Sequence, residues 1–457
     1  MSIVAELVKN VLETPFERFD PAEVDRARAK LIDVVGCIIG GANAPGCSML
    51  VDLIQEWGGK KEGVMLVHGI RVPLHNAALV NGVMARSYDF EPTGPLVDGK
   101  STPAHLSGTT VPTAITVAEH KGVSGRDLLT ALILGDDIAS RIIAASNLNV
   151  DSGFDSTGTV NAFGAAAIAG RLMGLNEQQM LNAFGIVLNQ FAGTFQNIFD
   201  AAHTFKLPQG LSAQAGIFSV ALAKKGFTGV KDPLLSRYGY FALYCKSYQL
   251  DVLTKDLGKH FYMDNTCKPY PCCRSNHAAI DAVLRLGKSH PIEINDIDEI
   301  IVDITPTARD FAVGQPFKIR DVPQIDAAFS IQYNVANALL RKDAKLVHFT
   351  DEYVRDEKIA DMVNKIRLTS TTSPETPLGA GVKIKMRNGG EYEARVDMPK
   401  GHGVLTPLTP AEKKAKFFDN VDFSNTIPGD RAEKALGLLE RLEEVDDVTE
   451  VFKLLVL

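Results

Sequence analysis

The spacing of apolar residues predicts mostly helices in the first half of the chain. From the N-terminus to about residue 265, apolar positions recur at every third or fourth residue, which is the period of one helix face. Residues 124–145 follow this pattern behind Ser124, which can cap the first turn. Residues 176–192 repeat the pattern, and residues 211–225 stop at Gly226, a favourable helix end. We therefore expect an all-α bundle here.

In the last third of the chain the pattern changes to that of strands. Residues 298–305 alternate apolar and polar positions, and residues 381–396 form two such runs around an Asn-Gly pair, which predicts a β-hairpin. Helix-like runs lie between them. We expect a mainly α protein with a large helical domain at residues 1–266 and a smaller α+β domain at 267–400. A C-terminal segment, 401–457, would pack back on the helical domain.

The composition is that of an ordinary globular protein, and it removes several function classes. The 457 residues carry a net charge of −7 without a basic block, which argues against a nucleic-acid partner. The apolar stretches fall short of the roughly 20 residues that cross a bilayer, and the N-terminus shows no basic leader. No nucleotide-binding glycine motif occurs. We expect a cytoplasmic protein with no membrane partner, whose six cysteines stay reduced.

The densest group of reactive residue types is CKPYPCCRSNHAAIDA, residues 267–282. Its Cys and His spacing lacks the second cluster that would complete a tetrahedral zinc site, so we predict no metal. A cysteine nucleophile paired with His277 is a second interpretation, behind inert buried thiols. A lone histidine is more often structural than catalytic. Here Arg274 offers a fork for a carboxylate and Lys268 adds positive charge, which favours His277 as a base.

A second candidate is the polar segment 87–112, which is dense in Gly, Pro, Ser and Thr and contains Asp89, Thr93 and His105. Long polar loops between helices often carry function. The plain alternative is a solvated loop in which Asp89 caps a helix.

Two further segments hold single candidates. Lys206 lies just before a proline and the next helix, where it is either a surface charge or a buried ammonium that binds a carboxylate. Asp155 and Thr157 precede a helix of small residues, whose N-terminus could hold an anion. Simple N-capping from this segment, by Ser156 or Thr157, is the alternative.

Several dispersed motifs give the chain a resemblance to a known family. They are SYDF (87–90), HLSG (105–108), STGT with GAAAIAGRLMGL (156–175), FKLPQG (205–210), KPYPCCRSNHAAIDA (268–282) and FSIQYNVA (329–336). In this order they are similar to the MmgE/PrpD proteins, which include 2-methylcitrate dehydratase, cis-aconitate decarboxylase and iminodisuccinate epimerase.

The resemblance implies a large helical domain with a smaller α+β lid domain, an active site between the two, and a homodimer. It implies neither metal nor organic cofactor. Carried over motif by motif, it assigns the site to Asp89, which would orient a histidine, and to His105, Lys206, His277 and Tyr333, with Thr93 beside them.

One position departs from the family pattern. Where the dehydratases and decarboxylases have a histidine, this chain reads FDSTGT and places Asp155. A dehydratase must protonate its departing hydroxyl, and at neutral pH an imidazolium is a better donor than an ionised aspartate. The departure therefore favours an epimerase.

The chemistry that the resemblance implies makes or breaks a bond at carbon next to a carboxylate. His277 and His105 would exchange protons, Lys206 and Arg274 would hold substrate carboxylates, and Tyr333 would donate a hydrogen bond or a proton. We expect a lyase acting on a small polycarboxylic acid, a dehydratase or decarboxylase. The alternatives are an epimerase of a dicarboxylic substrate such as iminodisuccinate, and a protein that binds a carboxylate without turning it over.

Overall fold

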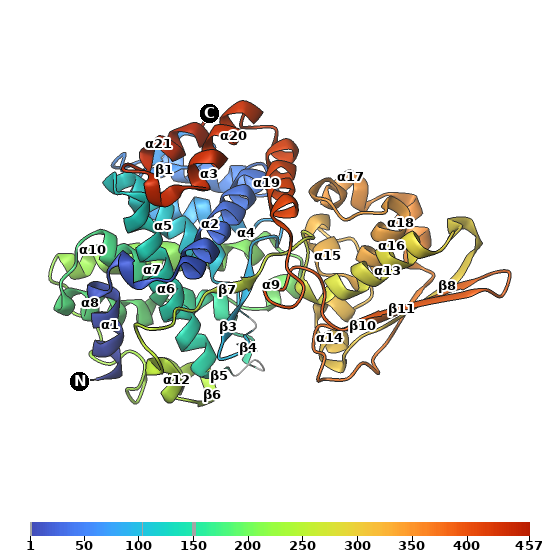
Figure 1. The fold of residues 1–457 in the computed structure, drawn as a ribbon, viewed down its shortest axis with the longest axis horizontal. Helices are drawn as coiled ribbons and strands as arrows, with labels where there is room; N and C mark the ends of the chain where they lie inside the picture. Colours follow the sequence, from blue (N-terminus) through green and yellow to red (C-terminus); the bar gives the residue numbers. More distant parts are fainter. Residues whose placement is uncertain (1, 103, 149–151) are drawn as a thin grey trace.

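The computed structural model describes residues 2–102, 104–148 and 152–457 and shows a mainly helical chain in two parts (Figure 1). The larger part contains α1 (Ile3–Glu13), α2 (Pro21–Gly41), α3 (Cys47–Trp57), α4 (Leu74–Arg86), α5 (Ser107–Lys121), α6 (Gly125–Ala145), α7 (Val160–Leu172), α8 (Glu177–Val187), α9 (Gln196–Phe199), α10 (Leu207–Lys224), α11 (Tyr240–Tyr244) and α12 (Asp251–Thr254). The mainly α class is thereby confirmed.

The residues predicted to start and end helices do so in the structure. The Ser124 side chain accepts a hydrogen bond from the third residue of α6, and Asn176 forms a capping box with Gln179 at the start of α8. α10 ends two residues before Gly226, which has a φ of +90°. Helices α4 and α10 approach each other closely at two glycines. A Cβ on Gly82 of α4 would lie 2.8 Å from the Cα of Gly210 in α10, so glycine is required there.

The expectation of an all-α first part is wrong in detail, because short strands interrupt its helices. They are β1 (Gly63–Met65) with β2 (Ile70–Val72), β5 (Ser146–Leu148) with β6 (Cys245–Tyr248), and the three-stranded sheet of β4 (Lys100–Ser101), β3 (Thr93–Val97) and β7 (Asp264–Thr266). Two strands of the last sheet, β3 and β4, lie within the segment expected to be a polar loop. The sheet pairs Thr93 with Thr266, far apart in the sequence.

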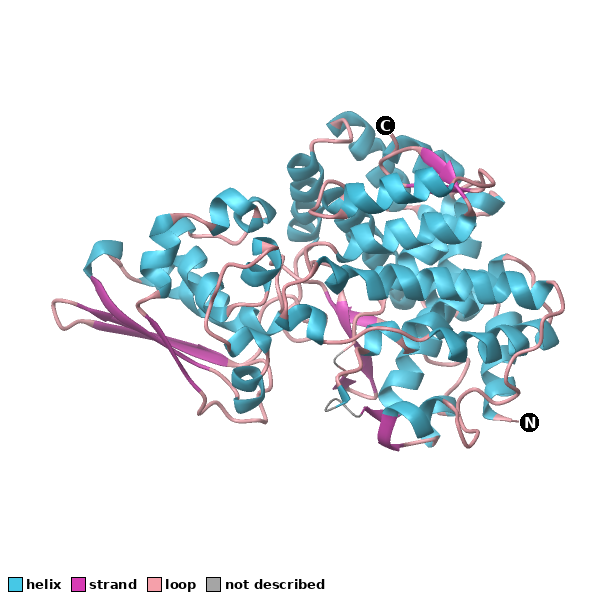
Figure 2. Cartoon of the chain, turned by 180° about the vertical axis from the view of Figure 1, so that it is seen from behind, coloured by secondary structure: helices cyan, strands magenta, loops and turns pink. Residues whose placement is uncertain are grey.

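The second part is a four-stranded sheet with helices packed on it (Figure 2). Its elements are α13 (His277–Ser289), β8 (Ile297–Asp303), α14 (Pro306–Asp310), α15 (Pro323–Ala328), α16 (Ile331–Arg341), α17 (Asp351–Val354), α18 (Glu357–Val363), β9 (Ile366–Thr369), β10 (Ala380–Met386) and β11 (Glu391–Val396). The strand order is β11-β10-β8-β9, with only β8 and β9 parallel. The β10–β11 hairpin turns at Gly389, as expected, with a φ of +87°.

The end of the chain returns to the larger part. Helices α19 (Pro410–Ser424), α20 (Gly429–Leu439) and α21 (Thr449–Phe452) lie against α2 and α5, drawn red in Figure 1. The domain boundaries at 266 and 400, and the role of the second part as a lid, stay predictions. Among the described residues, no helix combines the length and the apolar composition that a membrane span needs.

Two contacts join the second part to the first near the end of α4. The Gln324 side-chain amide donates a hydrogen bond to the Ser87 carbonyl. The Phe329 ring packs edge-on against Phe205, with ring centroids 5.2 Å apart. The second part therefore contacts the segment that contains Asp89.

Candidate active site

The end of α4 and the loop behind it bury three charged side chains close together. Arg86 is the last residue of α4, and Asp89 and Glu91 follow in the loop; each is at most 4% exposed. Asp89 has a φ of +49°, in the left-handed region that aspartate adopts more readily than most residues with a side chain. The resulting turn directs the Asp89 carboxylate back to the Arg86 guanidinium.

Arg86 is the centre of this cluster. Its Nη1 donates to Asp89 Oδ1 and Glu91 Oε1 and lies 2.8 Å from His105 Nδ1. His105 Nδ1 is also 3.0 Å from Glu91 Oε1. On its other side, the guanidinium stacks on the Phe205 ring, 4.4 Å from the centroid, an arrangement that stabilises a desolvated cation.

Lys268 completes what we name the Arg86 cluster: Arg86, Asp89, Glu91, His105 and Lys268. The Lys268 ammonium is fully buried and donates to Asp89 Oδ1 at 2.6 Å and to the Asp89 carbonyl at 2.7 Å. Two cations thus meet two carboxylates. Buried charges persist only when they are paired and hydrogen-bonded in this way.

The backbone around His105 is fixed, whereas its imidazole reaches the surface. The side-chain amides of Asn161 and Gln209 donate to the His105 carbonyl at 2.7 and 2.9 Å. Asp264 accepts two backbone N–H groups at the start of α5, at 3.1 and 2.8 Å, and so caps that helix end. The His105 side chain is 24% exposed. A small molecule can therefore approach this imidazole.

The electrostatics of the cluster keep His105 neutral. Burial lowers the pKa of His105, and the Arg86 and Lys268 charges lower it further, although Glu91 opposes them. Burial alone would raise the pKa of Glu91, but Arg86 and His105 outweigh it and lower the pKa to about 2. At neutral pH a neutral imidazole, which can accept a proton, lies beside an ionised carboxylate.

His277 has a different environment. It begins α13 and is fully buried; its Nδ1 lies 3.0 Å from Arg274 Nη1 and its Nε2 3.2 Å from the Cys272 carbonyl. Burial, and then the Arg274 charge, lower the pKa of His277 well below its usual value. Arg274 also donates to the carbonyls of Pro399 and Lys400, so its guanidinium fastens this loop.

Lys206 follows Phe205, the residue that packs against Arg86, but its ammonium is bound elsewhere. Its neighbour Phe205 supports Arg86, whereas Lys206 Nζ donates to the Pro45 carbonyl at 2.8 Å. The side chain is buried, and burial lowers the pKa of Lys206. The structure therefore does not bring this ammonium into contact with His105.

Tyr333 is also directed away from the Arg86 cluster. It is fully buried in the second part, where its hydroxyl donates to the His348 carbonyl and accepts from Arg341 at 3.4 Å. Burial raises the pKa of Tyr333 to about 12. In this arrangement the hydroxyl stabilises the packing of α16.

Three other predicted site residues, Thr93, Asp155 and Thr157, make local hydrogen bonds. Thr93 begins β3, and its hydroxyl donates to the Ala104 carbonyl at 2.6 Å, which closes the hairpin before His105. Asp155 accepts the Thr157 N–H at 2.9 Å, so the capping expected of Ser156 or Thr157 falls to Asp155. Asp155 is also among the charges that stabilise the Arg86 cation. Asp155 is thus the member of this group that acts on the cluster.

The cluster contains the one described group whose ligand atoms could suit a metal. Atoms of Asp89, Glu91 and His105 lie within 4.8 Å of one another. However, the Arg86 guanidinium contacts an oxygen of each carboxylate and the Nδ1 of His105. Arg86 therefore supplies the positive charge at the place where an ion would bind, and these residues do not favour a metal.

The sequence analysis missed Arg86 and Glu91. The signal was weak but present, because Arg86 ends the apolar stretch LVNGVMA and Glu91 lies five residues later beside a phenylalanine. Charged residues flanked in this way are candidates for burial as a pair.

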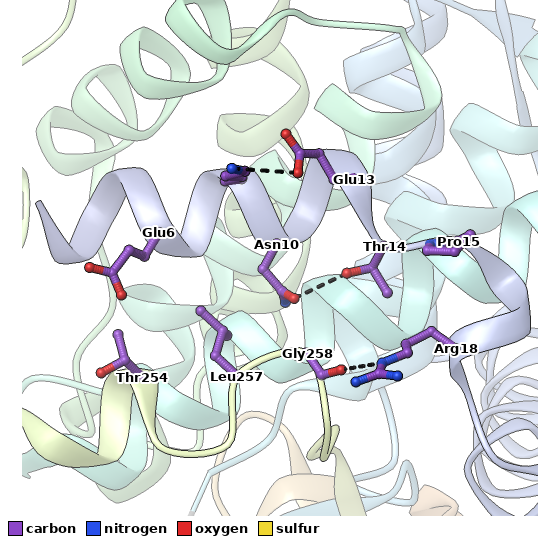
Figure 3. Close-up of a pocket in the computed structure, with 10 residues that line it drawn as sticks. Glu6, Asn10, Glu13, Thr14, Pro15, Arg18, Thr254, Leu257 and Gly258 are labelled. Carbon is purple, nitrogen blue, oxygen red and sulfur yellow. Dashed lines mark hydrogen bonds and ion pairs between the residues drawn. The ribbon is translucent and has the colours of Figure 1, made fainter. Parts of the chain in front are cut away.

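A groove elsewhere on the molecule is lined by charged and polar residues but, among the described residues, contains no histidine. It lies between α1 and the loop after α12 (Figure 3). Its polar groups bind one another: Thr14 donates to Asn10 at 3.0 Å, and Arg18 donates to the Gly258 carbonyl at 2.8 Å. The Arg86 cluster therefore remains the better candidate.

Comparison with known proteins gives the class of this chain. Residues 5–253 match the MmgE/PrpD N-terminal domain, and residues 270–443 match the MmgE/PrpD C-terminal domain. The chain belongs to the MmgE/PrpD family, which confirms the resemblance seen in its motifs.

Several relatives are named as cis-aconitate decarboxylases or as similar to them. The chain is 23% identical to a cis-aconitate decarboxylase-like protein of Aspergillus oryzae over 99% of its own length and 97% of that protein. It is 26% identical to the cis-aconitate decarboxylase of Homo sapiens over 84% of this chain and 80% of the relative. The corresponding enzyme of Mus musculus is 25% identical, with 84% and 79% covered. These similarities support a lyase.

Proposed function

We propose that this protein is a lyase that acts on a small polycarboxylic acid by moving a proton at the carbon next to a carboxylate, with His105 as the base. The observation that carries the proposal is the His105 imidazole, which is neutral, partly exposed and flanked by the Arg86 and Lys268 cations. The similarity to cis-aconitate decarboxylases supports the same class of substrate.

The chemistry needs both a base and nearby positive charge. A proton on carbon next to a carboxylate is very weakly acidic, so the negative charge that forms as it leaves must be stabilised. His105 accepts the proton, and the electron pair moves toward the carboxylate. Arg86 lies at Nδ1 of the imidazole and Lys268 beyond it at Asp89, so both cations act on that charge through space and not by contact. In a dehydratase, the hydroxyl on the neighbouring carbon takes up a proton and leaves as water, and the electron pair forms the double bond. In a decarboxylase no proton is removed first: the bond to a carboxylate breaks, carbon dioxide leaves, and the electron pair left behind takes up one proton, so the histidine must then act in its protonated form.

The test is proton exchange. The protein is incubated in deuterated water with cis-aconitate, 2-methylcitrate and an imino-dicarboxylic acid, and carbon-bound deuterium and new products are followed by NMR. A lyase gives a new or altered alkene together with exchange. If every acid that binds stays protonated and unchanged, the protein is a carboxylate-binding protein without turnover.

Asp155 favours a second candidate, an epimerase of a dicarboxylic acid. Its carboxylate accepts the Thr157 N–H and lies in the field of Arg86. An acceptor held in this way is a poor source of the proton that a departing hydroxyl needs. An epimerase needs no leaving group, because the proton taken from one face is replaced on the other. In the exchange experiment an epimerase gives deuterium and inverted configuration without a new alkene.

Assembly and location follow the same resemblance. We propose a cytoplasmic homodimer, and size-exclusion chromatography with light scattering measures the mass of the particle against the 49.5 kDa chain.

A further inference from the structure

We propose that Glu91 and Arg86 are positioning residues for His105: Glu91 fixes the tautomer with the hydrogen on Nδ1 and a free Nε2 facing the surface, and Arg86 acts on the same ring with the opposite charge. The inference uses the proposed function only for the role of His105 as a base. The tautomer itself is a property of the resting protein and is measured without any substrate.

The number of hydrogens on Arg86 Nη1 is the first step. Nη1 carries two hydrogens but contacts three atoms: Asp89 Oδ1, Glu91 Oε1 and His105 Nδ1. One of the three contacts therefore lacks an Arg86 hydrogen. The charged carboxylates bind such hydrogens more strongly than a neutral imidazole does.

Glu91 decides between the two tautomers. If His105 carried its hydrogen on Nε2, two acceptors, Nδ1 and Glu91 Oε1, would face each other at 3.0 Å. Glu91 would then have Arg86 as its donor at Oε1. The other carboxylate oxygen of Glu91, Oε2, is buried without a hydrogen-bond partner in the described part of the chain, so Glu91 has few donors to lose. With the hydrogen on Nδ1, the contact between Nδ1 and Oε1 becomes a charge-assisted hydrogen bond, which is stronger than a bond between two neutral groups. Asp89 has less need of a donor, because it also pairs with Lys268.

The orientation leaves the other nitrogen available. Among the described residues nothing bonds His105 Nε2, and the side chain is 24% exposed. A base must present an unprotonated nitrogen within reach of the substrate proton. The Nδ1–H tautomer does so, whereas the opposite tautomer would present an N–H. Arg86 and Glu91 thus act through His105 and need not contact the substrate.

The two positioning residues act on His105 with opposite charge. Arg86 lowers the pKa of His105, and Glu91 raises it. A neighbouring charge at this distance shifts a pKa by about 1–3 pH units. Removing each one should therefore move the titration of His105 in opposite directions, which loss of packing alone would not do.

The experiment is ¹⁵N NMR of protein labelled at its ten histidines, with the His105 signals identified by their loss in His105→Gln. Long-range ¹H–¹⁵N spectra above the titration range report which ring nitrogen carries hydrogen. We expect Nδ1–H in the unaltered protein. Glu91→Gln frees an Arg86 hydrogen for Nδ1, so the hydrogen moves to Nε2 and the pKa of His105 falls.

Arg86 is tested by a matched pair of variants. Arg86→Gln should raise the pKa of His105 by about 1–3 pH units, and Arg86→Lys, which keeps the charge, should restore most of the original value. If Arg86→Gln does not fold, Glu91→Gln and Arg86→Lys still decide the matter. The control is Glu299→Gln, which breaks the exposed ion pair with Arg367 on the sheet of the second part and should leave His105 unchanged.

Two results overturn the inference. One is an Nε2–H tautomer in the unaltered protein. The other is a Glu91→Gln variant that is folded and shows the same His105 tautomer and titration as its parent. Neither result depends on turnover, so they are distinct from a negative deuterium-exchange experiment, which overturns the proposed function alone.

Discussion

Two histidines of this protein each lie beside an arginine, and the contrast between them shows what makes an imidazole chemically useful. His105 has Arg86 on one side and the Glu91 carboxylate beside the same nitrogen, and it is partly exposed. His277 has Arg274 at one nitrogen and a backbone carbonyl at the other, and it is fully buried. The residue types are alike, but only His105 keeps a free nitrogen near the surface.

Arg86 and Arg274, the arginines beside these two histidines, have different hydrogen-bond partners. Around His105 the cations meet carboxylates and leave the ring available. Around His277 the Arg274 guanidinium is bound to the carbonyls of Pro399 and Lys400, so its hydrogens hold the backbone together. The segment that contains Arg274 and His277 is rich in reactive residue types, yet in this structure its side chains hold the backbone in place.

The strongest test of this comparison is the loss of His105. We expect His105→Gln to lower the rate of carbon-bound deuterium exchange by about 10²–10⁴-fold, the usual contribution of a general base. His290→Gln, at an exposed histidine, is the control and should leave the rate unchanged. An equal loss for a folded His277→Gln variant would break the comparison, because His277 would then reach the substrate in another arrangement of the chain.

The charge pairing of the Arg86 cluster predicts a large effect on stability. Lys268→Met leaves the Asp89 carboxylate buried without its ammonium partner and should cost about 3–5 kcal/mol of unfolding free energy. Adding Asp89→Asn should recover part of that loss. Urea unfolding followed by circular dichroism measures both. Lys255→Met, which breaks an exposed pair with Asp98, should cost at most about 1 kcal/mol; similar losses at both sites would mean that burial does not distinguish them.

His277 predicts a pH dependence. The pKa of His277 is lowered in the folded state by burial and then by Arg274. At a pH below the ordinary pKa of histidine, the unfolded chain therefore binds more protons at this residue than the folded chain does. Stability from this residue is present above about pH 6.5 and falls by about 1.4 kcal/mol for each pH unit below it, until the folded pKa is reached. His277→Gln should flatten the curve of unfolding free energy against pH in that window. An unchanged slope would show that His277 is not held neutral.

The smallest effect is expected at the cysteines beside His277. Burial raises the pKa of the Cys272 thiol well above its usual value and also raises that of Cys273, so neither is a ready thiolate. The double variant Cys272→Ser with Cys273→Ser should keep most of the exchange rate. A large loss in a folded double variant would revive the thiol mechanism and remove the contrast with His105.

Local signals made much of the fold predictable. Ser124 and Asn176 start helices by bonding their own first turns, and Gly389 turns a hairpin because it has no Cβ. Each of these effects acts within a few residues. Dispersed motifs of the family then located Asp89 and His105, and Lys268 was a candidate because of its charge near His277. The structure brings these three residues together.

The rest depends on contacts between distant residues. The pairing of Thr93 with Thr266 adds a strand to a segment that looks like a loop, because its own side chains do not specify the partner. Arg86 and Glu91 are close in sequence, yet their meeting requires the left-handed turn at Asp89. The sequence likewise did not show that the Lys206 ammonium and the Tyr333 hydroxyl bind backbone carbonyls outside the cluster.

Gln324 and Phe329 connect the second part of the molecule to residues that support the Arg86 cluster. Gln324 binds the Ser87 carbonyl two residues before Asp89, and Phe329 presses on the ring that supports Arg86. If the second part moved away from the first, the Phe205 ring would lose the packing of Phe329, and the Ser87 carbonyl would lose its hydrogen bond from Gln324. The position of the second part is therefore mechanically linked to the packing that supports the Arg86 guanidinium.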